Sequence, residues 1–457
     1  MSPGFSLGQL ICTLGGVPQN LPWDSLGRPV GAISTDSRHL NPGDGFVALR
    51  GETWDGHQFV AGAIERGAGV AIVDHQANLP DTLPLIRVAD TLTAYQTLGQ
   101  AWRRRFAIPV IAVTGSAGKT TMKELLAAVL GTQGRVLKTQ ENENNDIGVP
   151  KTLLQLRPDH AFAVIEMGMR ARGEIQRLAR LAQPTVGVIT NTGTAHIGRL
   201  GSREAIAQAK CELFAHLGWG DIAVYNWDSP LLRQLAPQVT AGRTLSYGLT
   251  GGDVVGTVTA TDLRVGDWIL PLPLPGEHNA VNYLGALGVA QTLGVDWTPL
   301  TQGLPVELPA GRSRRLTVGD SITLLDETYN ASPEAVIAAL KLLKSTAGRR
   351  RIPVLGAMRE LGDSAVSLHQ QVGEQVAALA FDQVVVLGDD PEVVALAAAA
   401  HPVPTERFTD PAALTAYLVA TLEPGDTLLF KASRSIGLDR IVTQVKKTLE
   451  AREPATD

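Results

Sequence analysis

One short stretch in the first third of the chain constrains its fold more than any other. Residues 108–113 form an apolar run typical of a strand, and a helical pattern opens at Met122. The segment TGSAGKTT, residues 114–121, lies between them. A strand, a glycine turn, a Lys-Thr pair and a helix in this order predict a phosphate-binding loop, because glycine amides and a helix N-terminus attract anions. The loop is shorter than the usual G-x-x-x-x-G-K-[ST] pattern, since Val113 stands five positions before Gly118.

The residues of this loop have separate expected roles toward a nucleotide. Backbone amides beside the two glycines would approach phosphate oxygens, and Lys119 would bring its charge to the β- and γ-phosphates. Thr120 or Thr121 would offer a hydroxyl to Mg²⁺. A bare turn is the alternative interpretation, and the flanking strand and helix argue against it. The expected nucleotide contacts are Gly115, Ser116, Ala117, Gly118, Lys119, Thr120 and Thr121.

Apolar runs alternating with helical segments predict the fold class. The chain has 457 residues, too many for one hydrophobic core, and we expect three segments with bounds 1–107, 108–310 and 311–457. Nearly continuous apolar strands separated by helices predict parallel sheets covered on both faces, and therefore an α/β protein. The expected strands lie at 45–49, 69–73, 85–88, 108–113, 162–165, 186–189, 222–225, 322–325, 352–355, 383–387 and 427–430.

Composition excludes several classes of partner. The formal net charge of −5 gives no general attraction to nucleic acid or to an anionic membrane. Two cysteines, Cys12 and Cys211, offer no disulfide framework. The first residues, MSPGFSLGQL, lack the pattern of a signal peptide, and no apolar run approaches the length of a membrane span. We expect a cytoplasmic monomer that binds small molecules.

Three side chains are candidate metal ligands, although each has a simpler interpretation. Glu166 closes the strand-like run FAVIE and could instead begin a helix. His196 lies in TNTGTAHIGRLGS, where a lone histidine after a turn is commonly a surface or capping residue. Lys210, in SREAIAQAKCELF, has the spacing of an exposed helix lysine.

Several ordered motifs resemble those of the Mur ligases, the ATP-dependent amide-bond-forming enzymes of peptidoglycan synthesis. The central motifs are TGSAGKTT, NENNDIGVP, VIEMGMRARGEI, TNTGTAHIGRLGSREAIAQAK and LPGEHNAVNYLGA. The flanking motifs are STDSRHLNPGDGFVALRGETWDGHQFV, LLDETYNASPEAV, VLGAMRELGDSAVSLHQQVG and FKASRSIGLDRIV. The resemblance covers essentially the whole chain. It implies a small N-terminal α/β domain that binds the UDP end of the substrate, a central parallel-sheet ATPase domain and a C-terminal Rossmann-like α/β domain.

The flanking motifs also imply the reaction. They point to the family activity that joins D-alanyl-D-alanine to the terminal carboxylate of UDP-N-acetylmuramoyl-tripeptide, with ATP and Mg²⁺, through an acyl phosphate. Three alternatives remain open at this point. They are another amide ligase of the superfamily such as folylpolyglutamate synthase, a phosphate-loop GTPase or kinase, and a non-catalytic nucleotide-binding scaffold.

The resemblance implies roles for residues that local patterns leave undecided. Glu166 and His196 fall on positions that bind Mg²⁺ together with Thr120, and Lys210 falls on a lysine that CO₂ carbamylates to help position a second Mg²⁺. The implied catalytic set is Lys119, His196, Lys210 and Arg312. Further implied ATP contacts are His278, Asn279, Asn282, Arg312, Asp326, Glu327, Tyr329 and Asn330. Implied contacts with the UDP-muramoyl substrate are Ser37, Arg38, Asp55, Gly56, His57, Asn142, Asn144 and Asn145.

Two positions depart from the family pattern. Glu327 follows Asp326 where the family usually has a second aspartate, so which acid meets the nucleotide is open. Ala357 stands where the family generally has an aspartate, and Glu360 is not an obvious replacement.

Overall fold

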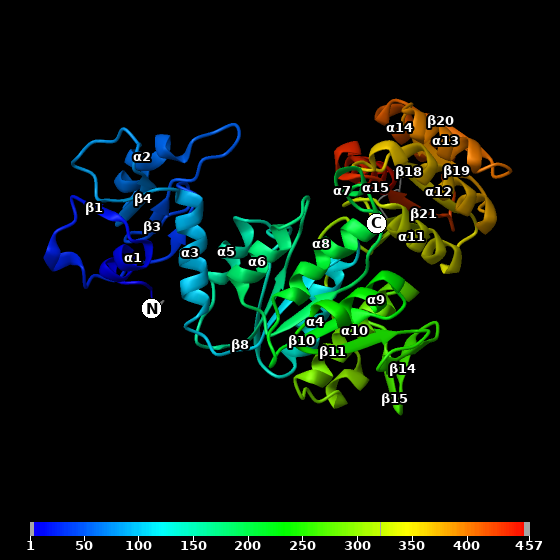
Figure 1. The fold of residues 1–457 in the computed structure, drawn as a ribbon. Coiled ribbons are helices and arrows are strands. Elements are labelled where there is room, and N and C mark those ends of the chain that lie inside the picture. The colour runs from blue at the N-terminus through cyan, green and yellow to red at the C-terminus, as the bar shows by residue number, and fades with distance from the viewer. Residues whose placement is uncertain (1–3, 320, 452–457) are drawn as a thin grey trace, which may run out of the picture. The chain divides into compact units, whose positions relative to one another are not determined.

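Four sheets organise residues 4–319 and 321–451, which this computed structural model describes, and the apolar runs of the sequence form their strands (Figure 1). The chain divides into two compact units. One contains residues 1–112, 133–168 and 175–186, and the other contains residues 113–132, 169–174 and 187–457.

The first sheet has five strands in the order β1-β5-β4-β3-β2. Strands β2 to β5 pair in parallel, and β1 is antiparallel to β5. Buried Phe46, Val60, Val73 and Leu85 belong to its core. The elements of this part are α1 (Leu7–Leu14), β1 (Val17–Gln19), η1 (Trp23–Ser25), β2 (Ile33–Ser34), β3 (Gly45–Val47), η2 (Gly56–Phe59), α2 (Val60–Glu65), β4 (Val70–Asp74), β5 (Leu85–Val88) and α3 (Thr91–Arg103).

The second sheet has seven strands in the order β12-β11-β10-β9-β6-β8-β7. Every residue of β6 and β9 is buried, as expected for strands covered on both faces. Its strands are β6 (Val110–Thr114), β7 (Arg135–Lys138), β8 (His160–Glu166), β9 (Val186–Ile189), β10 (Ile222–Asn226), β11 (Arg243–Gly248) and β12 (Val254–Val255). The accompanying helices are α4 (Lys119–Gly131), α5 (Gly148–Leu153), α6 (Glu174–Ala182), α7 (Ile197–Leu200), α8 (Arg203–Ala215), α9 (Pro230–Val239), α10 (Glu277–Thr292) and η3 (Thr298–Gln302).

A small antiparallel sheet follows the second sheet in the chain. It consists of β13 (Thr257–Val258), β14 (Asp262–Val265) and β15 (Trp268–Pro271). The Trp268 ring packs edge-on against Trp297. The sequence did not predict this sheet, because its strands are only two to four residues long and the middle one, β14, carries an aspartate and an arginine.

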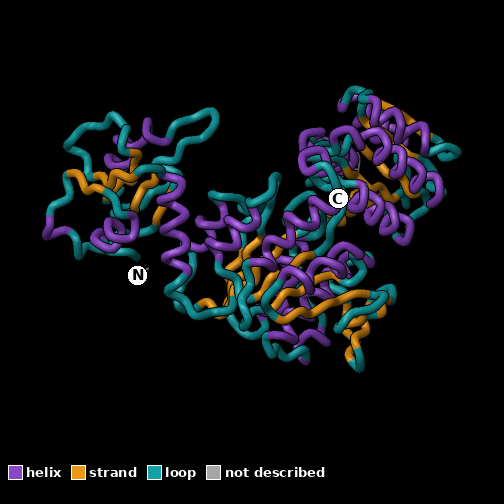
Figure 2. Tube along the Cα trace, in the orientation of Figure 1, coloured by secondary structure: helices purple, strands orange, loops and turns teal. Residues whose placement is uncertain are grey.

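The last sheet has six strands in the order β16-β17-β21-β18-β19-β20. All its neighbours are parallel except β16, which is antiparallel to β17. Figure 2 shows helices beside these strands. The strands are β16 (Arg314–Val318), β17 (Ile322–Asp326), β18 (Arg351–Gly356), β19 (Val384–Leu387), β20 (Thr405–Phe408) and β21 (Thr427–Lys431). The helices are α11 (Pro333–Ser345), η4 (Gly362–Ser364), α12 (Ala365–Leu379), α13 (Pro391–Ala399), α14 (Pro411–Thr421), η5 (Arg434–Ile436) and α15 (Leu438–Glu450).

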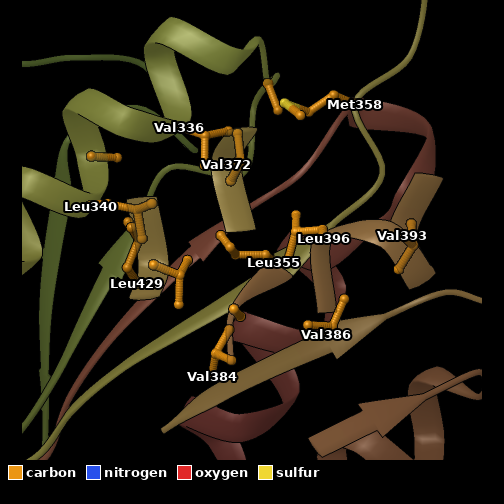
Figure 3. Close-up of a cluster of buried hydrophobic side chains, with 14 of the residues drawn as sticks. Val336, Leu340, Leu355, Met358, Val372, Val384, Val386, Val393, Leu396 and Leu429 are labelled. Carbon is orange, nitrogen blue, oxygen red and sulfur yellow. The ribbon is translucent and has the colours of Figure 1, made fainter. Parts of the chain in front are cut away.

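Two hydrophobic clusters explain why the strands of this sheet read as unbroken apolar runs. In β21, Leu429 packs into one cluster while Leu428 and Phe430 pack into the other. Neighbouring side chains of a strand point to opposite faces, so both faces of β21 are buried. Figure 3 shows the first cluster, with Leu340 of α11 near Leu429.

The predicted strands are confirmed, with bounds that differ by one or two residues. The strand expected at 108–113 begins at Val110, after Pro109, and continues to Thr114. Strands β1, β2, β7, β11, β12, β16 and β20 were not predicted. Of these, β16 carries two arginines and is largely exposed, so it does not form an apolar run. The bounds of the three expected domains stay predictions. Among the described residues, no helix is both long and apolar enough to cross a membrane.

Candidate active site

The predicted phosphate loop connects β6 to α4, in the order that the sequence indicates. Gly118 has φ +77°, a left-handed conformation that favours glycine, and α4 begins at the next residue. No side-chain hydrogen bond caps this helix start at Gly118, and the amides of a helix N-terminus attract anions. A phosphate is the natural ligand for such amides.

The residues that follow β9 hold the loop in shape. Asn191 Oδ1 accepts a hydrogen bond from the Ala117 amide at 2.9 Å, and Asn191 Nδ2 donates to the Ala117 carbonyl at 3.0 Å. Thr190 Oγ1 donates to the same carbonyl at 2.6 Å. The Ser116 amide donates to the Asn191 carbonyl at 3.1 Å. Two side chains from a neighbouring strand end therefore fix the central residues of the loop.

Close packing explains both glycines. A Cβ atom on Gly115 would lie 1.9 Å from Thr190 Oγ1, and one on Gly118 would lie 2.9 Å from Asn282 Nδ2. Any side chain at either position would displace the residues that shape the loop. The loop therefore offers backbone amides without obstructing side chains, which lets phosphate oxygens approach closely.

Lys119 and the threonines occupy the start of α4. Lys119 Nζ donates to the Gly115 carbonyl at 2.8 Å, so its ammonium group bends back over the loop. Thr120 is 1% exposed and Thr121 is 8% exposed. The positive charge and the hydroxyl groups predicted for phosphate and Mg²⁺ are thus brought together at one helix start.

Glu166 belongs to the other unit, where it ends β8. Its side chain is 1% exposed, and Oε1 accepts a hydrogen bond from Asn144 Nδ2 at 2.8 Å. The Glu166 amide donates to Thr139 Oγ1 at 2.9 Å. The carboxylate is therefore buried and oriented, which fits a metal ligand better than an exposed helix-start acid.

His196 lies in the loop between β9 and α8. Its backbone is left-handed, with φ +67°, and its Nδ1 atom pairs with Glu360 Oε2. Burial and the positive charge of Lys119 lower the pKa of His196, while Glu360 acts in the opposite direction. A neutral imidazole is the form that binds metal ions.

Lys210 is buried in α8, contrary to its local sequence pattern. The residue is 1% exposed. Burial lowers the pKa of Lys210 well below its usual range, and the charge of Lys119 adds to this effect. The interpretation as an exposed helix lysine is wrong, because Ala207, Ala209 and Leu213 are buried on the same helix.

The donor set fits Mg²⁺ held mainly by a nucleotide. Among residues 4–319 and 321–451, no three His, Cys, Asp or Glu side chains form a cluster that could hold a metal ion. Mg²⁺ bound to ATP keeps water and phosphate oxygens as ligands and needs only one or two protein groups. Thr120 and His196, which belong to one unit, and Glu166, which belongs to the other, each offer a donor group of this kind.

The residues expected at the adenine side gather around the start of α10. Asn279 Nδ2 donates to the Pro275 carbonyl at 2.7 Å and lies 3.4 Å from Ser313 Oγ. Asn282 is 6% exposed and packs beside Gly118 of the phosphate loop. Burial lowers the pKa of His278. Helix α10 thus joins the loop to the segment that begins near Gly311.

Arg312 stacks on Tyr329. The guanidinium carbon lies 3.7 Å from the ring centroid, and Arg312 Nε is buried with no hydrogen-bond partner among the described residues. Arg434 approaches the same ring at 5.9 Å. A buried donor without a partner carries a free-energy cost, so Arg312 is suited to an anionic ligand.

Family membership follows from matches along most of the chain. Family profiles described as Mur ligase family catalytic domain, Mur ligase middle domain, and Mur ligase glutamate ligase domain match residues 29–130, 113–290 and 311–434. The UDP-N-acetylmuramoyl-tripeptide–D-alanyl-D-alanine ligase of Synechocystis sp. is 53% identical over 90% of this chain and 91% of its own. The chain belongs to the Mur ligase family.

Other relatives and solved structures of this family agree along nearly the full length. The Escherichia coli ligase of the same name is 34% identical, covering 91% of this chain and 94% of its own. A crystal structure of MurF from Acinetobacter baumannii superposes with a TM-score of 0.87 at 32% identity, covering 98% of this chain and 99% of that one. The MurF ligase of Thermotoga maritima, solved in complex with ADP, has a TM-score of 0.83 at 30% identity, covering 92% and 98%.

The two departures from the Mur ligase pattern have different surroundings. Asp326 Oδ1 accepts from Thr328 Oγ1 at 2.6 Å, so this acid stabilises its own turn. Glu327 Oε1 accepts from Ser313 Oγ at 2.9 Å, and Glu327 Oε2 lies 3.5 Å from Lys431 Nζ. Ala357 is 1% exposed and belongs to the same hydrophobic cluster as Leu429. The residue that replaces the family aspartate is thus part of a hydrophobic core.

Strand β21 ends in a buried lysine, Lys431, which was not among the expected site residues. Lys431 is 5% exposed, and its Nζ donates to the Asn330 carbonyl at 3.1 Å. Burial lowers the pKa of Lys431, against the effect of Glu327. Lys431 therefore braces the turn that carries Asp326 to Asn330.

The candidate substrate residues of the first domain are partly occupied by internal contacts. His57 Nε2 accepts from the Asp74 amide at 3.0 Å, so Nδ1 carries the proton that bonds Asp55 at 2.5 Å. A Cβ on Gly56 would lie 2.5 Å from the Leu49 carbonyl oxygen. Both ring nitrogens of His57 therefore support this turn.

Arg38, one residue after Ser37, is the exposed member of this group. Its guanidinium group makes two hydrogen bonds to Asp36, at 2.9 and 2.8 Å, and its side chain is 79% exposed. Ser37 is half-buried. Contact of these residues with the UDP end of a substrate stays a prediction.

The three asparagines of NENNDIG have different local partners. Asn145 Oδ1 accepts from the amides of Ile147 and Gly148, at 3.1 and 2.9 Å, where α5 begins. The Asn142 carbonyl accepts from the Asn144 amide at 2.8 Å, while the Asn144 side chain binds Glu166. Asn144 is therefore tied to the expected metal ligand, and Asn145 has the conformational role that asparagine often has in turns.

Four residues that shape the site were not among the expected site residues: Thr190, Asn191, Glu334 and Glu360. The first two follow a predicted strand end, which is a usable signal. The two glutamates lie more than a hundred residues from the loop that they contact, so no local pattern could identify them.

Replacing Gly115 with alanine tests the loop geometry. We expect Gly115→Ala to weaken ADP binding by about tenfold or more, because overpacking against Thr190 distorts the phosphate contacts. Isothermal titration calorimetry with ADP and Mg²⁺ measures the change. Gly131→Ala, at the other end of α4 with no atom within 4 Å of the added Cβ, is the control. Equal affinity of Gly115→Ala and wild type would contradict the assigned loop.

Proposed function

We propose that this chain joins D-alanyl-D-alanine to the terminal carboxylate of UDP-N-acetylmuramoyl-tripeptide, using ATP and Mg²⁺. The phosphate loop between β6 and α4, with its clamped backbone and the overlying Lys119, is the observation that carries the nucleotide chemistry. Relatives with this activity in their name match along nine-tenths of the chain. The product is a precursor of peptidoglycan in cell-wall synthesis.

The reaction requires activation of a poor electrophile. A carboxylate oxygen of the tripeptide attacks the γ-phosphorus of ATP, and ADP leaves, which forms an acyl phosphate. The amine of D-alanyl-D-alanine then attacks the acyl carbon, loses a proton, and expels inorganic phosphate. No covalent bond to the protein is needed, so catalysis depends on positioning and charge stabilisation.

The charged groups of the site divide this work. Lys119 would bind the β- and γ-phosphates, and Arg312 would approach the transferred group from the third segment. Mg²⁺, bound with ATP, supplies further positive charge against the phosphates, and Thr120, Glu166 and His196 would hold it. The amides of the phosphate loop, from Gly115 to Thr121, would bind the oxygens between these charges.

Lys210 would act as a carbamate rather than as an amine. A neutral amine adds to CO₂ and loses a proton, and the lowered pKa of Lys210 keeps more of the amine neutral at a given pH. The carbamate is carboxylate-like and would help position a second Mg²⁺. Its burial in α8 supports this role, because an exposed ammonium would remain charged.

The remaining residues would bind the ends of the two large substrates. His278, Asn279 and Asn282 would contact the adenine side of ATP. The DETYN segment, through Asp326, Glu327, Tyr329 and Asn330, would line the nucleotide on the side of the third domain. Ser37, Arg38, Asp55, Gly56 and His57 would bind UDP, and Asn142, Asn144 and Asn145 would line the muramoyl-peptide.

Three domains, with bounds 1–107, 108–310 and 311–457, would divide these tasks between UDP binding, ATP binding and ligation. We also propose that the enzyme works as a monomer in the cytoplasm. A single chain supplies every proposed site residue, and ATP is a cytoplasmic substrate. Size-exclusion chromatography with light scattering tests the monomer.

A phosphate-release assay tests the function. We expect the purified chain to release phosphate from ATP only when Mg²⁺, UDP-N-acetylmuramoyl-tripeptide and D-alanyl-D-alanine are all present, with one peptide bond formed per phosphate. Mass spectrometry identifies the pentapeptide product. Release that does not depend on D-alanyl-D-alanine would contradict the proposed acceptor.

Removing the charge of the phosphate loop should abolish ligation. We expect Lys119→Ala to lower turnover by about a hundredfold or more, because the charge that stabilises the transferred phosphoryl group is lost. Circular dichroism and thermal unfolding check that the variant folds. Turnover above about a tenth of wild type would refute the role of Lys119. Lys344→Ala, which removes a lysine that contacts Ala380, is the control.

Chemical rescue tests the carbamate. We expect Lys210→Ala to be nearly inactive and to regain part of its turnover with acetate or formate, which would occupy the vacated space and restore a carboxylate. Lys446→Ala, at a half-exposed helix lysine, should leave turnover unchanged and stability within about 0.5 kcal/mol. Near-normal activity of Lys210→Ala without added acid would exclude the carbamate.

A further inference from the structure

The loop that carries His196 is held by two glutamates from the last segment of the chain. Glu334, near the start of α11, accepts from the Thr194 amide at 2.8 Å and from Thr194 Oγ1 at 3.1 Å. Glu360, after β18, pairs with His196 and also lies 3.6 Å from Arg199. All these residues belong to one unit.

The backbone around Glu360 is fitted to the same loop. Glu360 has φ +65°, an uncommon conformation for a residue with a side chain. Its carbonyl oxygen accepts from the Gly198 amide at 3.1 Å. A Cβ on Gly198 would lie 2.5 Å from the Gly362 amide nitrogen, so the two loops meet backbone to backbone. This packing brings the Glu360 side chain to the imidazole.

The ion pair determines which imidazole nitrogen can bind a metal ion. A carboxylate oxygen only accepts hydrogen bonds, so His196 Nδ1 must carry the proton that it shares with Glu360. Nε2 then has the free lone pair. Metal-binding histidines commonly donate their other N–H to a carboxylate, which fixes the orientation of the ring.

We propose that Glu360 is the positioning residue that holds His196 with Nε2 directed to the Mg²⁺ of the bound nucleotide. This rests on the proposed function, in which His196 is a metal ligand. Glu360 itself does not touch the metal ion or the substrate. Through it, the last segment of the chain contributes to metal affinity at a loop of the central segment.

Histidine NMR tests the orientation directly. In the full-length chain labelled with ¹⁵N-histidine, the signal that disappears in His196→Gln identifies this ring. We expect wild type and Glu360→Gln to show the proton on Nδ1, since the glutamine amide oxygen still accepts. Glu360→Ala should lose this preference. An unchanged tautomer in Glu360→Ala, or a spectrum of Glu360→Gln that matches Glu360→Ala, would overturn the proposal.

Metal binding provides the second readout. Electron paramagnetic resonance measures binding of Mn²⁺ with ADP, and the phosphate assay measures the Mg²⁺ concentration for half-maximal turnover. We expect Glu360→Ala to raise the Kd for Mn²⁺ and the Mg²⁺ concentration for half-maximal turnover by about tenfold or more. Loss of the hydrogen-bond partner of a metal ligand weakens metal binding by this order in other metal sites. Glu374→Ala, which removes an exposed acid of α12 that bonds Gln370, should change neither.

The outcomes separate this proposal from the proposed function. If wild type catalyses the reaction but Glu360→Ala keeps wild-type metal affinity, Glu360 is not the positioning residue. If wild type forms no pentapeptide, the proposed function fails whatever the variant does. Thermal unfolding of each variant identifies any that does not fold, and Glu360→Gln keeps the shape of the side chain if the alanine variant is unstable.

Discussion

The clamp on the phosphate loop is the interaction on which the rest of the candidate site depends. Thr190 and Asn191 hydrogen-bond both the amide and the carbonyl of Ala117, so contacts within the protein fix the centre of the loop. A loop that is already ordered loses little conformational entropy when it binds a phosphate, so less of the binding free energy is offset. Gly115 and Gly118 are needed because their missing side chains let the neighbouring residues come this close. Asn282, one of the residues expected at the adenine side, packs beside Gly118 of the same loop.

Burial affects the charge of two lysines of the candidate site. Lys119, Lys210 and Lys431 all belong to one unit, and the last two are almost fully buried. Burial of an ammonium favours its neutral form unless an anion compensates. Glu327 compensates Lys431, whereas a carbamate would remove the positive charge of Lys210. Lys119, the lysine expected to bind phosphate, is more exposed than these two, and its Nζ donates to the Gly115 carbonyl.

The segment after β9 contacts the phosphate loop and also carries His196, the expected metal ligand. Its first residues clamp the phosphate loop, and its later residues include His196 and the contacts to Glu334 and Glu360. Ala357 stands where the family generally has an aspartate, but the last segment still places two acids, Glu334 and Glu360, against this loop. Ala357 is in a hydrophobic core, and the chain's own carboxylates at 334 and 360 make the polar contacts.

The sequence by itself determined the α/β class, the positions of the strands that form apolar runs, the phosphate loop and the family, because these depend on local patterns. A parallel strand that is buried on both faces has apolar residues at successive positions, which are visible as an apolar run. The residues of a phosphate loop are consecutive in the chain, so they form a visible motif. Tertiary structure decided the rest. Lys210 has the local pattern of an exposed helix lysine, and only the packing of α8 in the folded chain buries it. The partners of His196 and the small sheet of β13 to β15 were also hidden, since a carboxylate 164 residues away leaves no trace in a local pattern. Contacts between distant residues form only when the chain folds, and those contacts set the orientation and charge of the side chains in the site.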